Sequence, residues 1–289
     1  MFALIGIVIV IGAIVGGYLM EKGNLLVLLQ PAELVIIGGA GLGTLLIANP
    51  IHILSGIFKD LLGVLKGSKY TKKAYLEALQ LLYELFTFAK KEGPAKLEAE
   101  IETPAEAAIF KKYPLFAADP FSRDYICDTL RMMLTGGVTP HDAEMIMESD
   151  AEVHHHEKAK PTSALTTVAD ALPGLGIVAA VLGVVITMGS IGGPPEQIGH
   201  KVAAALVGTF LGILLCYGFI GPLASNMTKV NDEAQDFHRV LRVGVTGYLK
   251  GMPIPIATES ARRMIPPHLR PSMKEMEESF RAAKEAAHG

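Results

Sequence analysis

Residues 202–228 read VAAALVGTFLGILLCYGFIGPLASNMT, a run that contains no Asp, Glu, Lys or Arg. A helix needs about 20 apolar residues to cross the roughly 30 Å hydrocarbon core of a bilayer. Three more windows of the chain meet this condition, at residues 1–20, 34–58 and 171–195. We therefore expect membrane-spanning helices near residues 2–20, 33–49, 171–191 and 202–223.

Two readings without membrane spans fit these windows less well. Residues 1–20 lack the basic start and the small-residue cleavage site of a secretory signal peptide. Helices buried in a soluble core normally keep one polar stripe, and the other three windows have none. The sequences therefore favour membrane spans.

The overall composition narrows the function classes. The chain has 289 residues, of which 50% are hydrophobic and 19% charged, against about 25% charged in soluble domains. Its formal net charge of −3 leaves no basic excess for a nucleic-acid backbone. The two cysteines, Cys127 and Cys216, form no disulfide framework or metal spacing. A soluble enzyme and a nucleic-acid-binding protein are both disfavoured.

Basic residues indicate the orientation, because loops rich in Lys and Arg favour the cytoplasm. Residues 51–167 hold fourteen of them and residues 229–289 hold ten, whereas the short links at 21–32 and 192–201 hold one each. Both termini and both long segments should therefore be cytoplasmic. The expected domains are spans one and two (1–50), a cytoplasmic helical domain (51–168), spans three and four (169–225) and a cytoplasmic tail (226–289).

The polar segments have helical patterns. In residues 71–91, apolar side chains recur at three- and four-residue spacing opposite a charged face. The composition of a helix start occurs at 103–106 (TPAE), 139–142 (TPHD) and 272–275 (SMKE). No strand-like alternation of useful length appears. We predict an all-α polytopic membrane protein with four transmembrane helices and a helical cytoplasmic domain.

The third and fourth spans are rich in small residues at helical spacing. These are Gly176, Ala179, Ala180 and Gly183 on the third, and Ala204, Gly208, Gly212 and Cys216 on the fourth. Membrane helices associate by close backbone approach at such residues, so both spans should pack tightly against neighbours. Thr187 and Thr209 can donate to preceding carbonyls, which makes a structural role the default, although either could line a water-filled pore.

Within the spans, no ionisable side chain lies near mid-depth, where a carrier would need one. Asp170 precedes the third span and Glu33 opens the second on its outer side. If the protein moves protons, another chain must supply the titrating group. Pro173 is expected in the first turn of the third helix, whereas Pro222 should release the carbonyl of Gly218 and bend the fourth.

Several long segments resemble the MotA family of flagellar stator proteins, within the MotA/TolQ/ExbB proton channel superfamily. They are GGYLMEKG (16–23), QPAELVIIGGAGLG (30–43), SKYTKKAY (68–75), DALPGLGIVAAVLGVV (170–185) and VGTFLGILLCYGFIGPLA (207–224). They agree with the family in order and spacing over nearly the whole chain. The resemblance implies a multi-pass protein of the bacterial inner membrane that turns proton flow into torque.

The resemblance also implies partners and an ion path. Family members form a pentamer around a dimer of MotB, whose membrane helix supplies the proton-accepting aspartate. By the same resemblance, Pro173 and Pro222 lie near the conduction path and coupling region, Thr209 faces the pore, and Asp170 matches an acidic position beside the first proline. Ala180 stands where sodium-driven relatives carry a hydroxyl residue, which favours protons.

For rotor contact, the resemblance points to one basic and one acidic residue in the cytoplasmic loop. Glu98 matches the acidic position. Lys90 occupies the basic position in place of the arginine of some relatives, so the charge is kept and the bidentate geometry is lost. These charges should meet the switch-ring protein of the rotor. Read without the family, both residues belong to an ordinary solvated helix end.

Three alternatives make different demands on the sequence. An energiser subunit of the ExbB/TolQ type also uses proton flow, but those relatives have three spans and an external N-terminus. A membrane enzyme would need a nucleophile with its base, paired aspartates or a metal triad in the spans, and none is present. The His154, His155 and His156 run resembles a metal cluster, but adjacent helical side chains splay about 100° apart. We expect a solvated loop or helix end there, and no cofactor.

Overall fold

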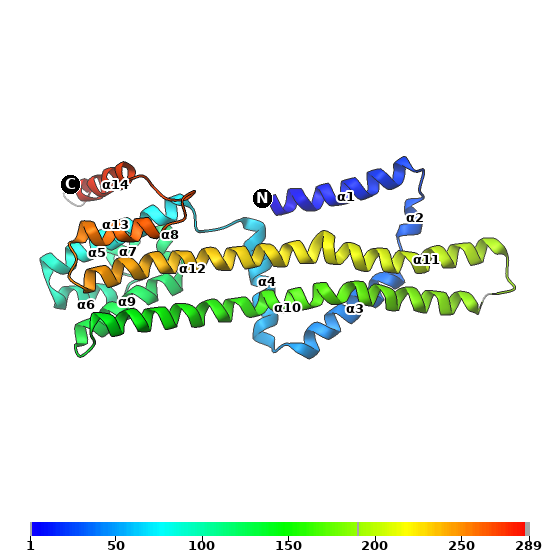
Figure 1. Cartoon of the computed structure of the whole chain (residues 1–289), viewed down its shortest axis with the longest axis horizontal. Helices are drawn as coiled ribbons and strands as arrows, with labels where there is room; N and C mark the ends of the chain where they lie inside the picture. Colours follow the sequence, from blue (N-terminus) through cyan, green and yellow to red (C-terminus); the bar gives the residue numbers. More distant parts are fainter. Residues whose placement is uncertain (1, 190, 287–289) are drawn as a thin grey trace. The chain divides into compact units, whose positions relative to one another are not determined.

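The computed structural model describes residues 2–189 and 191–286, and over that part of the chain its helices are joined by loops without any strand (Figure 1). The predicted all-α class is confirmed. The helices are α1 Phe2–Met20, α2 Leu25–Leu28, α3 Pro31–Ala48, α4 Ile51–Lys66, α5 Lys72–Glu92, α6 Pro94–Glu102, α7 Ala108–Lys111, α8 Pro114–Ala117, α9 Pro120–Thr135, α10 Pro140–Met188, α11 Pro195–Leu214, the π-helix η1 Leu215–Ile220, α12 Gly221–Leu249, α13 Ile254–Met264 and α14 Met273–Ala286.

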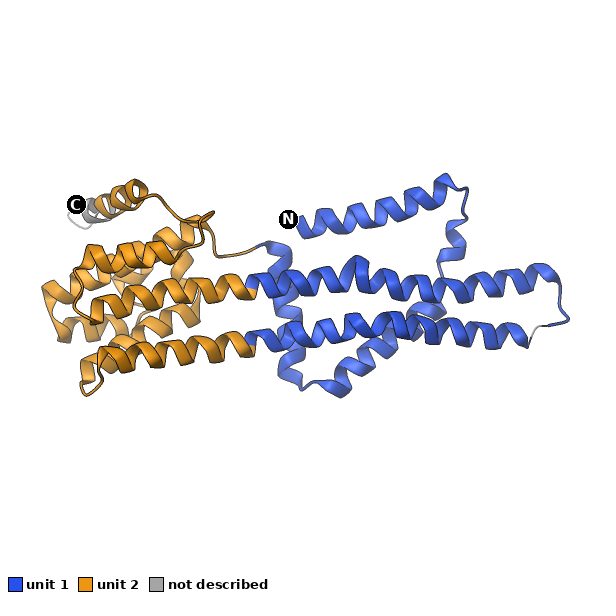
Figure 2. Ribbon diagram, viewed as in Figure 1, with its two compact units in different colours: residues 1–67, 158–230 blue, residues 68–157, 231–289 orange. Residues whose placement is uncertain are grey.

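Two compact units divide the chain (Figure 2). Unit 1 comprises residues 1–67 and 158–230, and unit 2 comprises residues 68–157 and 231–289. Segments of unit 1 and unit 2 therefore alternate twice along the chain. The division falls at other positions than the expected 50, 168 and 225, because α4 packs in unit 1 and because α10 and α12 each continue through the division without a break.

Unit 1 contains the apolar helices. Within the described residues, four helical stretches are long and apolar enough to cross a membrane, and they begin at Phe2, Leu25, Pro140 and Pro195. The first, Phe2–Met20, matches the expected span, and the second, Leu25–Ala48, ends one residue before the expected end but begins eight residues before the expected start. The third and fourth are far longer than predicted, because α10 does not begin at residue 171 and the last helix does not end at 223. The lack of charged residues predicted only the apolar part of each helix. It gave no indication that the helix continues into polar residues.

Glycines bring α10 and α11 into direct backbone contact. A Cβ atom at Gly176 would lie 2.8 Å from the carbonyl oxygen of Gly208, and one at Gly212 would lie 2.9 Å from the Cα of Gly176. Farther along, a Cβ at Gly183 would lie 2.8 Å from the Cβ of Ala205. Such distances leave no room for a side chain. The predicted tight packing of these spans is confirmed, and we call this contact the glycine seam.

Unit 2 has a continuous hydrophobic core around α5. Most of the apolar stripe expected in residues 71–91 is buried, with Tyr75, Leu79, Leu82 and Phe86 at 0% exposure and Ala89 partly buried. The helix ends at Gly93, whose φ of +86° suits a glycine. Phe86 stacks on Tyr248 of α12 at 4.2 Å between ring centroids. The periodicity therefore predicted both the helix and the face that it buries.

Two of the three predicted helix starts are confirmed. Thr139 and Asp142 exchange hydrogen bonds at the start of α10, and Ser272 and Glu275 do the same at the start of α14. The start expected at Thr103 is wrong. Thr103 instead ends α6, and its carbonyl accepts the N–H groups of residues 106 and 107 in a single turn. The extended backbone of Ala107 then stops the helix from continuing.

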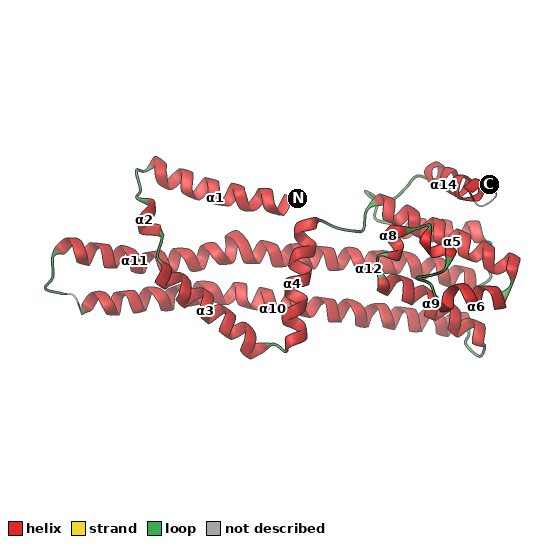
Figure 3. Cartoon of the chain, turned by 180° about the vertical axis from the view of Figure 1, so that it is seen from behind, coloured by secondary structure: helices red, strands yellow, loops and turns green. Residues whose placement is uncertain are grey.

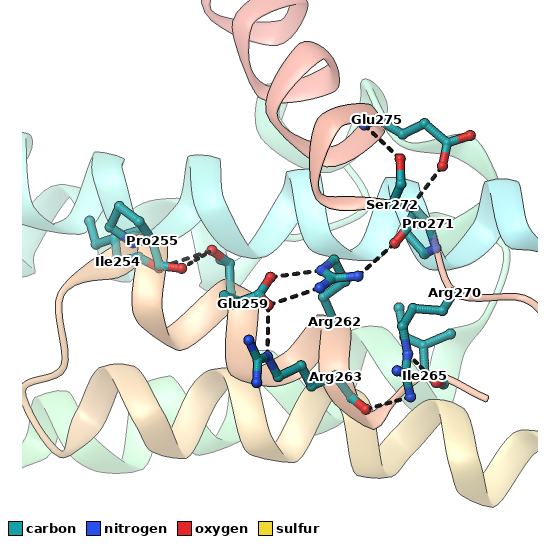
Figure 4. A network of polar contacts seen from close by, with 11 residues as sticks. Ile254, Pro255, Glu259, Arg262, Arg263, Ile265, Arg270, Pro271, Ser272 and Glu275 are labelled. Atoms are coloured by element: carbon teal, nitrogen blue, oxygen red, sulfur yellow. Dashed lines mark hydrogen bonds and ion pairs between the residues drawn. The ribbon is translucent and has the colours of Figure 1, made fainter. Parts of the chain in front are cut away.

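An arginine cluster fixes the segment between α13 and α14 (Figure 4). Glu259 accepts hydrogen bonds from Arg262 at 2.7 and 2.8 Å and from Arg263 at 2.8 Å. The hydrogen bonds from Arg262 are the largest cause of a Glu259 pKa of about 2. Arg262 also donates to the carbonyl of Pro271 at 2.8 Å. The cluster thereby holds the loop that leads into α14.

A buried polar cluster lies beside the aromatic core of unit 2. His238 is 1% exposed and meets the ring of Phe121 edge-on, with centroids 4.7 Å apart. Asp119 accepts from Tyr70 at 3.2 Å and from Ser122 at 2.8 Å. Burial lowers the pKa of His238 to about 3, although the nearby Asp119 opposes the shift. The imidazole is therefore neutral in the folded protein at neutral pH.

We predict that His238 makes unit 2 sensitive to acid. Its pKa in the folded chain lies below the ordinary 6.5, so the unfolded chain binds the extra proton between these values and stability falls as the pH drops through that window. The slope from one such group is at most about 1.4 kcal/mol per pH unit. Acid unfolding followed by near-ultraviolet circular dichroism should show a shallower pH dependence for His238→Asn. An unchanged slope would contradict this role of His238.

The glycine seam predicts a sharp contrast between two neighbouring positions. Gly176→Ala should lower the free energy of unfolding by about 1–3 kcal/mol, because its methyl group would overlap α11. At Gly174 nothing lies within 4 Å of the position that a methyl group would take, so Gly174→Ala should stay within about 0.5 kcal/mol of the wild type. Thermal melting of the chain in detergent measures both. Equal melting temperatures for the two variants would argue against the seam.

Candidate functional site

Two predicted ion-path residues lie on either side of the glycine seam. Ala180 on α10 is half-buried, and its backbone nitrogen would lie 3.2 Å from a Cβ at Gly208. Thr209, also half-buried, follows Gly208 on α11. The structure therefore brings Ala180 to the same level of the helix pair as Gly208, the residue before Thr209.

The two threonines of this pair differ. Thr187 is 1% exposed and donates to the carbonyl of Gly183 at 2.8 Å, as expected for a structural hydroxyl. Among the described residues, no group accepts a hydrogen bond from the Thr209 hydroxyl. Thr209 therefore keeps its hydroxyl available at the level of Ala180.

Glu33 of α3 also lies at the level of Ala180 and Gly208, a position that the sequence did not predict. The residue lies in the first turn of α3, as expected, but its side chain is only 6% exposed. Its Oε2 atom would lie 2.7 Å from a Cβ at Gly208, so the carboxyl group packs directly against the glycine at position 208. A charged residue in the first turn of a helix usually caps it in solvent, and only the packing of α3 on α11 distinguishes this case.

The two prolines lie at different levels of the pair. Pro173 is inside α10, not in a first turn as predicted, and the neighbouring Leu172 carbonyl approaches Gly212. Pro222 is exposed near the start of α12, ten residues beyond Gly212 or about 15 Å along a helix. Asp170 is exposed one turn before Pro173. The structure does not bring Asp170 or Pro222 to the level of Ala180.

The helix before Pro222 departs from α-helical geometry, a form that the sequence did not predict. Residues 215–220 form a π-helix, and the N–H of Gly221 donates to the carbonyl of Cys216. Proline lacks the N–H that would continue the α-helical pattern, and π-helical turns occur mainly at such irregular points. The wider turn takes up the defect, so the helix continues through Pro222 to Leu249.

The predicted rotor residues lie on the surface of unit 2. Lys90 is exposed in the last turn of α5, and Glu98 is exposed on α6. Among the described residues, neither has an ion-pair partner. The neighbouring Glu92 instead pairs with Lys91 and Lys96. Lys90 and Glu98 are therefore free to meet another protein.

The histidine run does not lie in a loop, which corrects the prediction. His154, His155 and His156 are all inside α10. His154 stacks on Phe121 at 3.6 Å between centroids, and the His155 carbonyl accepts from Asn231 at 3.3 Å. Over the described part of the chain, no group of three His, Cys, Asp or Glu side chains could hold a metal ion. The run serves helix packing in unit 2.

Comparison with known proteins gives matches along almost the whole chain. The family model described as Motility protein A N-terminal matches residues 4–93, and the model of the MotA/TolQ/ExbB proton channel family matches residues 118–238. Motility protein A of Escherichia coli (strain K12) is 42% identical over 98% of this chain and 96% of its own length. Chemotaxis protein LafT of Vibrio parahaemolyticus is 36% identical over 94% and 96%.

Solved structures share the fold. The flagellar MotAB stator complex from Bacillus subtilis contains a chain with a TM-score of 0.73 and 23% identity, covering 95% of this chain and 98% of that one. The MotAB structure from C. jejuni gives a TM-score of 0.77 and 18% identity, covering 94% and 98%. Both likenesses extend over the two units.

Proposed function

The chain belongs to the Motility protein A family of flagellar stator subunits, and we propose that with a MotB partner it converts proton flow into torque on the rotor. The glycine seam carries this proposal. It lines up Ala180 and Thr209 on two apolar helices, but from Pro173 to Met188 and from Val202 to Ile220 there is no Asp, Glu, His, Lys or Arg. A path through this pair therefore needs a carboxylate from outside these two helices, and we infer that a partner chain supplies one.

MotB is the partner that would provide this carboxylate. The solved relatives are MotAB complexes. An aspartate on that helix would accept a proton from outside and release it inside. Each transfer would change the charge beside the seam and shift the subunit around its partner.

Protons fit the path better than sodium ions. A metal cation needs several oxygen ligands, whereas position 180 is alanine and contributes no side-chain oxygen. Thr209 is the hydroxyl at this level of α11. We infer a path in which a single proton moves between carboxyl groups, with the Thr209 hydroxyl beside it.

The assembly and orientation follow from exposed surfaces and charge. No residue of α1 is buried, which suits contact with lipid and with neighbouring copies in a pentamer. The distribution of basic residues supports a cytoplasmic location for unit 2 and both termini. Lys90 and Glu98 would then meet the rotor switch ring. The protein sits in the inner membrane as a multi-pass subunit and, on this proposal, catalyses no covalent reaction.

The energiser alternative is less well supported. An ExbB/TolQ-type subunit belongs to the same broad channel family. The N-terminal match to Motility protein A and the four candidate spans favour the stator, because the alternative should have three spans. Swimming is therefore the activity to test.

Expression of this chain with MotB should restore swimming to a bacterium that lacks its own Motility protein A.

Pro173→Ala should remove swimming without loss of stability. Alanine supplies an N–H for the carbonyl of Ala169, which adds about 1 kcal/mol to the helix and removes a flexible point in α10. Swimming speed and melting temperature are the measurements. A stable, assembled Pro173→Ala protein that swims at wild-type speed would contradict the coupling role.

Lys90→Glu should strongly reduce swimming and leave folding unchanged. Like charges brought together at a contact cost several kcal/mol, whereas an exposed substitution changes stability by about 0.5 kcal/mol or less. Lys73→Glu is the matched control, since Lys73 is an exposed lysine at the opposite end of α5. Swimming in soft agar compares the three proteins. Equal losses in both variants would mean that Lys90 has no special contact.

A further inference from the structure

Glu33 is the one carboxyl group of α3, and its surroundings are unlike those of a surface residue. Its side chain is 6% exposed, and its Oε2 atom is buried without a hydrogen-bond partner. Seen from behind, α3 crosses α10 and α11 (Figure 3), and these helices share a buried cluster that includes Ile37 and Ala179. The carboxyl group is thus held among apolar membrane helices.

The free oxygen points at the glycine seam. A Cβ at position 208 would lie 2.7 Å from Glu33 Oε2, 3.1 Å from the Cβ of Ala179 and 3.2 Å from the nitrogen of Ala180. Gly208 directly precedes Thr209, so the free oxygen of Glu33 lies at the level of the candidate ion path. A group that merely capped α3 would turn to the free N–H groups of its first turn, and this oxygen does not.

The chemistry of this position favours a proton as ligand. An ionised carboxylate buried without a partner costs several kcal/mol, so the position tolerates the neutral, protonated form. A metal ion would need several oxygen ligands, and the neighbours at Gly208, Ala179 and Ala180 supply no side-chain oxygen. The other ionisable groups on α10 and α11 lie farther from this level. On α11, Lys201 is about two turns before Gly208, and His200 and Glu196 are farther still. On α10, Asp170 lies about 15 Å before Ala180.

We propose that Glu33 is a proton-binding station on the outer part of the ion path, which rests on the proposed stator function. A hydronium ion from outside gives its proton to a Glu33 carboxylate oxygen and leaves as water. The O–H bond of Glu33 breaks as an O–H bond forms on the carboxylate of the partner helix at the seam. The carboxylate left on Glu33 then takes the next proton. The sequence Gln30-Pro31-Ala32-Glu33 thereby begins a helix and places its proton carrier.

Proton flux through vesicles that contain the chain with MotB tests the proposal, at fixed membrane potential and varied external pH. Glu33→Gln keeps the size of the side chain and removes the titrating oxygen, so its flux should fall about a hundredfold. Glu33→Asp keeps a carboxyl group and should retain flux with an altered dependence on external pH. Glu196→Gln removes an exposed acidic group near the start of α11 and should behave as the wild type.

The possible outcomes distinguish the station from the stator function. A Glu33→Gln flux within about tenfold of the wild type, with the same pH profile, would overturn the station and leave the stator function intact. Absence of flux in the wild-type complex would instead overturn the proposed function itself. If Glu33→Gln assembled poorly, Glu33→Asp would decide: an altered pH profile supports the station, and a wild-type profile overturns it.

Discussion

The glycine positions of the contact between α10 and α11 have no room for a methyl group. At Gly212 it would lie 2.6 Å from the carbonyl oxygen of Leu172, and at Gly176 it would lie 2.8 Å from that of Gly208. Membrane helices have no hydrophobic drive toward one another, so such close packing is what holds them together. The same contact sets Ala180 beside Gly208, leaves space for the Glu33 carboxyl group, and fixes which residues of the two helices share a level. The features that we assign to ion movement depend on it.

Much of this fold could be predicted from the sequence, for identifiable reasons. The charge-free run at 2–20 is the first helix to the residue, because uniform apolarity needs no tertiary context. The stripe of α5 predicted its buried face for the same local reason. At Thr139 and Ser272, side chains and backbone of the same turn form the cap, and these starts were also correct. Short-range sequence patterns therefore sufficed for features that depend only on residues of the same helix or turn.

The failures have a common cause in contacts between distant segments. Pro173 resembles a helix start in isolation, but α10 runs through it, and Ala169, Leu172 and Ala179 on its two sides are buried. Glu33 resembles a capping residue, but its side chain is buried against Gly208 of α11. His154 was expected in a solvated segment and instead stacks on Phe121 of α9. No short-range pattern encodes these partners, and the ion-path roles of Pro222, Thr209 and Asp170 likewise remain predictions from resemblance.

The central claim is that the ion path is shared between two chains. We propose that the membrane helices of this chain provide the seam and one buried carboxyl group near its outer part, and that the partner provides the carboxylate that completes the path. Proton flux should be measured in vesicles that contain this chain alone, MotB alone, or both, at one membrane potential. The account predicts flux only when both chains are present. Comparable flux through vesicles that contain this chain alone would contradict it.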